Sequence, residues 1–183
     1  MKNNNTRAFN ITFAAMLMAV AIVLSIVESA LPNIMPAVPG VKLGLSNIVV
    51  MYALFFVNYK SVFSIVILKG FFAFMTRGMV AGALSFTGGM LSVVIMIIIS
   101  FISKKKASYL ILSIFGAISH NIGQFIIVMY IYKGMNINFY LPVLIISGLI
   151  AGLVTSMVLR VTVPHLGNIN NNIDNSINNF KDK

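Results

Sequence analysis

The sequence lacks cysteine and tryptophan altogether, and acidic residues are scarce. Its 183 residues include three Asp or Glu against thirteen Lys or Arg, and Glu28 is the only acidic residue before position 174. Without cysteine there is no disulfide framework and no thiolate-ligated metal site. Paired carboxylates for acid–base chemistry or for magnesium are also missing, as is a phosphate-binding ATPase loop. We therefore expect no enzymatic activity from this chain, no catalytic residue, no metal site and no cofactor.

Apolar residues are what the sequence has in excess. They make up 59% of the chain, and the mean hydropathy is +0.98. A soluble monomer of this size has too much wet surface to hide so many apolar side chains. The net charge of +10 consequently does not indicate nucleic acid. The composition predicts a multi-pass protein of the cell membrane whose main partner is the lipid bilayer.

Six apolar segments predict an all-α bundle of six transmembrane helices. A spanning helix needs roughly 20 apolar residues, and the candidates are 8–27, 42–58, 61–77, 83–102, 109–132 and 141–163. The second and third are short and closely joined, which is also compatible with a re-entrant or strongly tilted arrangement. We expect one membrane domain over residues 1–167. The Asn-rich tail, 168–183, is predicted to be disordered, although its regularly spaced isoleucines leave a weak interfacial helix open.

Basic residues predict the orientation, because Lys and Arg accumulate on the cytoplasmic side of membrane proteins. With the N-terminus inside, nine of them fall in cytoplasmic segments, and Lys42, Arg77 and Lys133 lie at the outer ends. Both termini should therefore be cytoplasmic. Most of the net charge is then a topology signal.

Two ionisable residues fall in the middle of predicted spans, where each costs several kcal/mol unless it faces protein, water or a partner. Lys69 lies in the third span, and His120 lies in the fifth with Asn121 and Gln124 beside it. Both spans run from inside to outside, so Lys69 and His120 should lie at similar depth. The alternatives are a helix–helix hydrogen bond for His120 and snorkelling for Lys69. We place all four in a candidate substrate site.

A second group of charges lies at the predicted outer boundary. Glu28 ends the first span, Lys42 opens the second and Arg77 ends the third. These residues either form a structural ion pair or give an outward-opening cavity a positive field that suits an anionic ligand. One carboxylate is too few for a proton relay. We include all three in the candidate site.

The segment between the first two spans contains three prolines, at 32, 36 and 39, and is expected to be a stiff loop. It either covers a cavity or simply connects two helices. Asn47 follows it and could bind a ligand, as could the backbone at Gly88 and Gly89, where a close approach is allowed. Other small residues indicate helix packing. Ala15 and Ala19 on the first span fit either packing or docking of another membrane protein.

Four stretches resemble the Gx transporter family, which is also catalogued as heptaprenyl diphosphate synthase component I. They are PAVPGVKLGLSNI at 36–48, LKG at 68–70, SFTGGMLS at 85–92 and SHNIGQ at 119–124. The resemblance covers roughly residues 10–163 and leaves out the tail.

That family is similar to the S components of energy-coupling-factor importers. This similarity implies a six-helix subunit that captures a nutrient from outside and associates with a transmembrane T subunit and ATPases. Ala15 and Ala19 match the pattern with which S components contact the T subunit. The site then implies a small, anionic and partly apolar substrate. The enzyme name implies an alternative role, as a non-catalytic membrane partner in heptaprenyl diphosphate or quinone biosynthesis.

Overall fold

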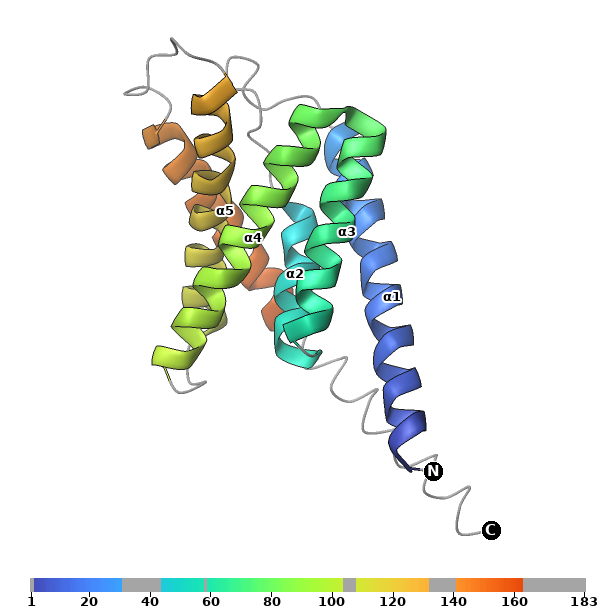
Figure 1. The fold of residues 1–183 in the computed structure, drawn as a ribbon. Coiled ribbons are helices and arrows are strands. Elements are labelled where there is room, and N and C mark those ends of the chain that lie inside the picture. The colour runs from blue at the N-terminus through green and yellow to red at the C-terminus, as the bar shows by residue number, and fades with distance from the viewer. Residues whose placement is uncertain (1, 31–43, 58, 104–107, 132–140, 163–183) are drawn as a thin grey trace.

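A computed structural model describes residues 2–30, 44–57, 59–103, 108–131 and 141–162 (Figure 1). All regular structure in these residues is helical. The helices are α1 (Lys2–Ala30), α2 (Leu45–Phe56), α3 (Tyr59–Arg77), α4 (Met79–Ile102), α5 (Tyr109–Ile131) and a C-terminal helix, Leu141–Thr162. The last helix is the orange to red ribbon of Figure 1. The predicted all-α membrane fold is confirmed.

Five of the six helices are long and apolar enough to cross a bilayer, α1 over Ile11–Ala30. The exception is α2, whose 12 residues extend only about 18 Å against a hydrocarbon core of about 30 Å. The second segment is therefore a short helix and not a full-length span over 42–58. Helix α4 begins at Met79, four residues before its predicted start. Of the six predicted spans, the second is therefore too short to cross the membrane.

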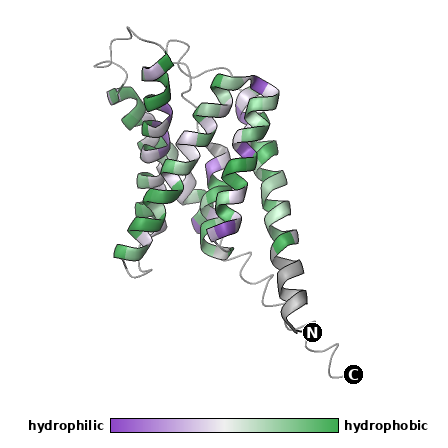
Figure 2. Ribbon diagram, in the orientation of Figure 1, coloured by the Kyte–Doolittle hydropathy of each residue, from purple (hydrophilic) through white to green (hydrophobic). Residues whose placement is uncertain are grey.

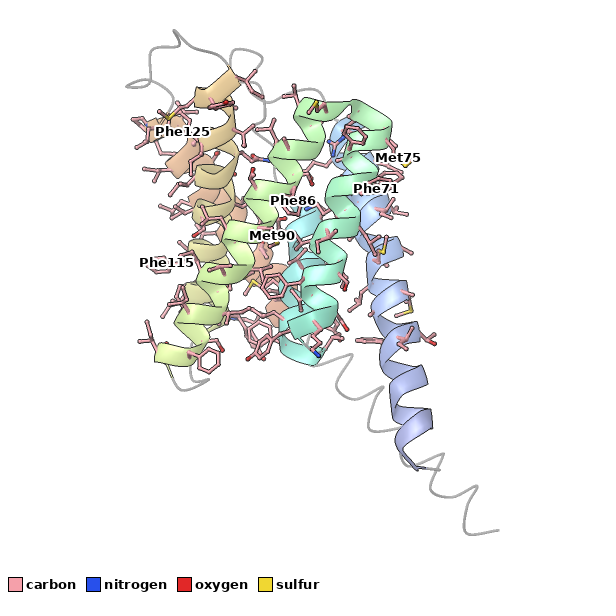
Figure 3. All side chains as sticks on the ribbon, in the orientation of Figure 1. Phe71, Met75, Phe86, Met90, Phe115 and Phe125 are labelled. Atoms are coloured by element: carbon pink, nitrogen blue, oxygen red, sulfur yellow. The ribbon has the colours of Figure 1, made fainter. Side chains whose placement is uncertain are left out.

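The distribution of side chains is inverted relative to a soluble protein. Apolar residues dominate the helices (Figure 2), and large apolar side chains such as Phe71, Met75, Phe86 and Phe115 are exposed on the outside of the bundle (Figure 3). In contrast, Glu28, together with many serines and amides, is buried. Lipid is as apolar as leucine, so an apolar exterior costs nothing there, whereas polar groups need partners inside.

Helix α2 lies in the interior of the bundle and forms much of its core. Five consecutive residues, Val49 to Ala53, are buried, which an α-helix achieves only when it is enclosed on all sides. They pack with Leu17 and Ala21 of α1 and with buried side chains of the other helices. The short helix is therefore surrounded by the long ones, and its first residues lie inside the protein.

Glycines bring α4 and α5 into close contact. A Cβ added at Gly123 of α5 would lie 2.8 Å from the carbonyl oxygen of Thr87 and 2.9 Å from the Cα of Gly88, both on α4. The Thr87 hydroxyl also donates a hydrogen bond to the Gly123 carbonyl oxygen, at 3.2 Å. Small residues at such crossings let helices approach and gain dispersion contacts, which drive association in lipid. We call this contact the α4–α5 seam.

Glycines also allow close contacts of α4 with α3 and of α5 with the C-terminal helix. Gly78 alone connects α3 to α4, with φ +88, a conformation that favours glycine. A Cβ at Gly152 of the C-terminal helix would lie 2.7 Å from the Cα of Ile114 on α5. The helices α3, α4, α5 and Leu141–Thr162 therefore form a closely packed series.

The predicted covering loop and the tail lie outside the described residues. The cytoplasmic placement of the termini and the single-domain boundary at 167 remain predictions.

Enlarging the seam should destabilise the bundle. Gly123→Leu forces α4 and α5 apart, and overpacking of this kind costs about 1–3 kcal/mol. Ala15→Leu adds bulk on an exposed face of α1 and is the matched control. We expect a lower melting temperature for Gly123→Leu only, measured by size exclusion of heated, fluorescently tagged protein because the chain has no tryptophan or cysteine. Equal melting temperatures would contradict the seam.

Candidate binding site at the start of helix α2

The first turn of α2 begins at a glycine inside the bundle. Gly44 precedes the helix in the left-handed conformation, with φ +73, and no side chain caps the helix. The Gly44 N–H donates a hydrogen bond to the Glu28 carboxylate in the last turns of α1. Helix N-termini carry unpaired N–H groups and a partial positive charge. This end of α2 is therefore held by a carboxylate and is electrostatically suited to an anion.

Lys69 is joined to the same turn. Its side chain is 5% exposed near the middle of α3, and its Nζ donates a hydrogen bond to Oδ1 of Asn47 at 2.9 Å. Asn47 is in the first turn of α2. A buried ammonium is costly in a low-dielectric interior unless polar groups surround it. The snorkelling alternative for Lys69 is thereby disfavoured, since the side chain is directed to a polar partner inside the bundle.

Arg77 and Glu28 form a separate group at the end of α3. The Arg77 Nη2 donates a hydrogen bond to the Ser25 hydroxyl of α1 at 3.3 Å, and its charge is attracted by the Glu28 carboxylate. Arg77 is half-buried and eight residues beyond Lys69, which is roughly 12 Å along the helix. These contacts correspond to the structural alternative for Glu28 and Arg77. Their group adjoins α2 through Gly44.

His120 lies in the α4–α5 seam, at a similar depth to Lys69. A Cβ at Gly88 would lie 2.8–2.9 Å from the imidazole atoms Cε1 and Nδ1, so this glycine provides the space that the ring occupies. The next residue, Gly89, packs against Val66, which is one turn from Lys69 on α3. The structure therefore places the two mid-span ionisable residues of the sequence on helices that flank α4, at a similar depth.

Three buried polar atoms near the seam have no hydrogen-bond partner among the described residues. They are Ser85 Oγ, His120 Nδ1 and Gln124 Oε1, and each of these side chains is 6% exposed. Native proteins leave few such atoms unpaired, because each costs about 1–3 kcal/mol. Their occurrence on one pair of helices indicates a place where another polar group is accommodated.

A small cavity adjoins the start of α2. It is lined by both apolar and polar groups, and its volume is about 10 Å³, which is room for about one water molecule. The lining residues are Gly44, Asn47, Met51, Ser92, Met96, Ser113, Gly116, Ala117, Asn121, Ala151 and Thr155. Asn47 thus connects the cavity on one side with Lys69 on the other.

Two residues of the predicted site have contacts that hold helices together. The Asn121 amide donates hydrogen bonds to the Leu144 carbonyl oxygen at 2.9 Å and to the Ser147 hydroxyl at 3.0 Å. It thereby joins α5 to the C-terminal helix, although it also lines the cavity. A Cβ at Gly89 would lie 2.7 Å from Val66, so Gly89 packs against α3 and not against His120.

The remaining predicted residues lie apart from this site or outside the described range. Ala15 and Ala19 are exposed on α1, so neither packs into the bundle. Lys42 lies outside the described residues.

The sequence-based site omitted Ser85 and most of the cavity lining. Ser85 and Ser92 are seven residues apart and flank Gly88 on α4, a spacing that places them along one helix face. From the sequence, small residues of this kind indicate helix packing. Hydroxyl spacing could have identified Ser85, whereas Met51 and Met96 have no distinguishing signal among twelve methionines.

The assembled chemistry is that of binding. The site has one ammonium, the N-terminus of a helix, three amides, an imidazole and hydroxyls. Within the part of the chain that the structure describes, no group of three His, Cys, Asp or Glu side chains could hold a metal ion. These groups can attract and orient a polar molecule.

The Glu28 carboxylate should stabilise the bundle in two separable ways. Glu28→Gln retains an acceptor for the Gly44 N–H but loses the attraction to Arg77, whereas Glu28→Ala loses both. An unpaired backbone donor costs about 1–3 kcal/mol, so the alanine variant should melt at the lower temperature. The charge component is measured by adding Arg77→Gln, which should cost less in the Glu28→Gln background than in wild type. Additive effects would disprove the coupling.

Comparison with known proteins identifies one relationship. The family model described as heptaprenyl diphosphate synthase component I matches residues 17–162, which include α2 to α5 and the whole C-terminal helix. No curated protein and no solved structure matches the chain. The match extends over well more than half of the sequence and includes Lys69, Asn47 and His120. The chain therefore belongs to the heptaprenyl diphosphate synthase component I family.

Proposed function

We propose that this membrane protein is the substrate-binding subunit of a nutrient importer, similar to an S component, and that it binds a small, anionic and partly apolar molecule at the start of α2. The observation that carries the proposal is the Lys69–Asn47 hydrogen bond. Burying an ammonium in a membrane protein costs several kcal/mol of free energy, and such residues are commonly found at a substrate or ion site. Its position beside a helix N-terminus adds a second feature that attracts anions.

The cavity supports a partly apolar ligand but requires the protein to adapt. Its present volume admits about one water molecule, so a nutrient must displace side chains. Met51 and Met96 line it, and methionine side chains are flexible enough to rearrange. In the proposed cycle, ligand binding promotes docking on the energy-coupling module.

Docking is assigned to the α1 face that carries Ala15 and Ala19. Both residues are exposed, as are Ile11, Met16 and Val20 around them. A helix face of this kind admits close approach of another membrane helix. The T subunit and its ATPases would supply the energy, because this chain has no ATPase loop.

Binding at Lys69 predicts a ligand that survives gentle extraction. We expect native mass spectrometry of wild type to detect an added mass that is absent from Lys69→Met. Lys60→Met is the matched control, because it removes the same charge from an exposed position at the other end of α3. Retention in Lys69→Met, or loss from both variants, would exclude Lys69 as the binding residue.

A second candidate function follows from the family description. The words "synthase component I" favour a non-catalytic partner of a prenyl diphosphate synthase. Affinity purification from the native membrane separates the two candidates. Recovery of a T subunit and ATPases, reduced by combined Ala15→Leu and Ala19→Leu, would support the importer. Recovery of a prenyl synthase without them, and with no effect of the alanine changes, would support the partner role.

A further inference from the structure

The unpartnered atoms of the α4–α5 seam lie within about one helix turn of one another and of Lys69. Gly88 of α4 packs against His120 of α5, and the helices are antiparallel. Ser85 lies about one turn before Gly88 on α4, and Gln124 lies about one turn after His120 on α5. Because the helices are antiparallel, these two steps run in the same direction, and Ser85 and Gln124 lie level with each other. On the other side of α4, a Cβ at Gly70 would lie 3.1 Å from Phe86, so Lys69 is at the same level. The three unsatisfied polar atoms and the ammonium thus lie within about one helix turn of one another along the bundle.

The charges of the site and of the adjoining end of α3 together favour a ligand with a single negative charge. The charged side chains at the site and at the adjoining end of α3 are Lys69, Arg77 and Glu28, with a sum of +1 in the part of the chain that is described. A carboxylate would balance that sum. A diphosphate carries at least one further negative charge, which the low-dielectric interior would leave uncompensated at high cost.

The residue types at the site also favour a carboxylate over a diphosphate. Phosphates are commonly bound by bidentate arginine, yet Arg77 lies roughly 12 Å from Lys69 along α3 and donates to Ser25. Diphosphates in proteins are commonly accompanied by Mg²⁺, which requires carboxylates. The described residues contain no cluster of acidic or histidine side chains that could hold this ion. Asn47, Ser85, His120 and Gln124 are neutral hydrogen-bonding groups that suit a carboxylate and its polar substituents.

We infer that the seam between α4 and α5 beside Lys69 binds the headgroup of an amphipathic monocarboxylate. This inference rests on the proposed function. The same site rejects prenyl diphosphates. The carboxylate accepts hydrogen bonds from Lys69 and from Ser85 or His120. The Gln124 amide contacts a polar substituent of the headgroup. The apolar remainder extends toward the methionines of the cavity. The molecule that the family name suggests is therefore not the ligand of this site.

Cysteine labelling tests this inference directly, because the natural chain contains no cysteine. Ser85→Cys is nearly isosteric and places one thiol at the site. In purified full-length protein in nanodiscs, both membrane faces are accessible. We expect anionic sulfonatoethyl methanethiosulfonate to react about tenfold faster than its cationic trimethylammonium analogue, because of the Lys69 charge. Adding Lys69→Met should abolish that preference.

Protection by soluble probes then defines the ligand class. Hexanoate should slow labelling of Ser85→Cys, whereas isopentenyl diphosphate and hexylamine should not. Gln124→Cys provides an independent second reporter. Ser119→Cys is the matched control, since Ser119 is equally buried on α5 but donates to the Phe115 carbonyl oxygen at 2.6 Å. It should be labelled slowly and without a charge preference.

The outcomes distinguish this inference from the importer function. Protection by isopentenyl diphosphate and not by hexanoate would overturn the carboxylate class. No labelling of either reporter, or equal labelling of Ser119→Cys, would overturn the site even if native mass spectrometry finds a retained ligand. Protection by hexanoate in a chain that copurifies only with a prenyl synthase would uphold the site and refute the importer.

Discussion

The hydrogen bond between Lys69 and Asn47 is the interaction around which the interior is arranged. An ammonium buried near the middle of a membrane helix is tolerated only if polar groups solvate it in place of water. Asn47 does so from the first turn of α2. Because α2 is short, that turn lies inside the bundle, and its helix N-terminus reaches the same depth as the ammonium. Because the Lys69 ammonium needs polar partners, polar groups are gathered around it at the start of α2.

The close packing of the surrounding helices makes this arrangement compatible with lipid. Gly88, Gly123 and Gly152 allow backbones to approach where the hydrophobic effect cannot drive association. The same packing puts His120 against Gly88 and leaves Ser85 and Gln124 about one turn away. The seam is tightly packed and still leaves three buried polar atoms without partners, which is the basis of the proposed binding site.

The family name and the chemistry of the chain need not conflict. A synthase component can lack the carboxylates that hold magnesium and diphosphate if its task is binding or assembly. The exposed Ala15 and Ala19 face on α1 offers a surface for such assembly. The charge sum of the interior favours a smaller negative charge than a diphosphate carries.

Composition and pattern were sufficient for the fold class, because lipid requires long apolar helices whose lengths can be counted along the chain. They also singled out Lys69, His120 and Gln124, since ionisable and amide groups are conspicuous in apolar spans. They left open whether the second segment crosses the membrane. They did not reveal that Gly89 packs against α3 or that Asn121 joins α5 to the C-terminal helix. Nor could they separate Arg77 from Lys69 or add Ser85 to the site. These facts depend on helix rotation and crossing, which are determined by steric fit between glycines and side chains far apart in sequence. The sequence by itself determined which residues are costly to bury, and only the tertiary structure decided which of them meet.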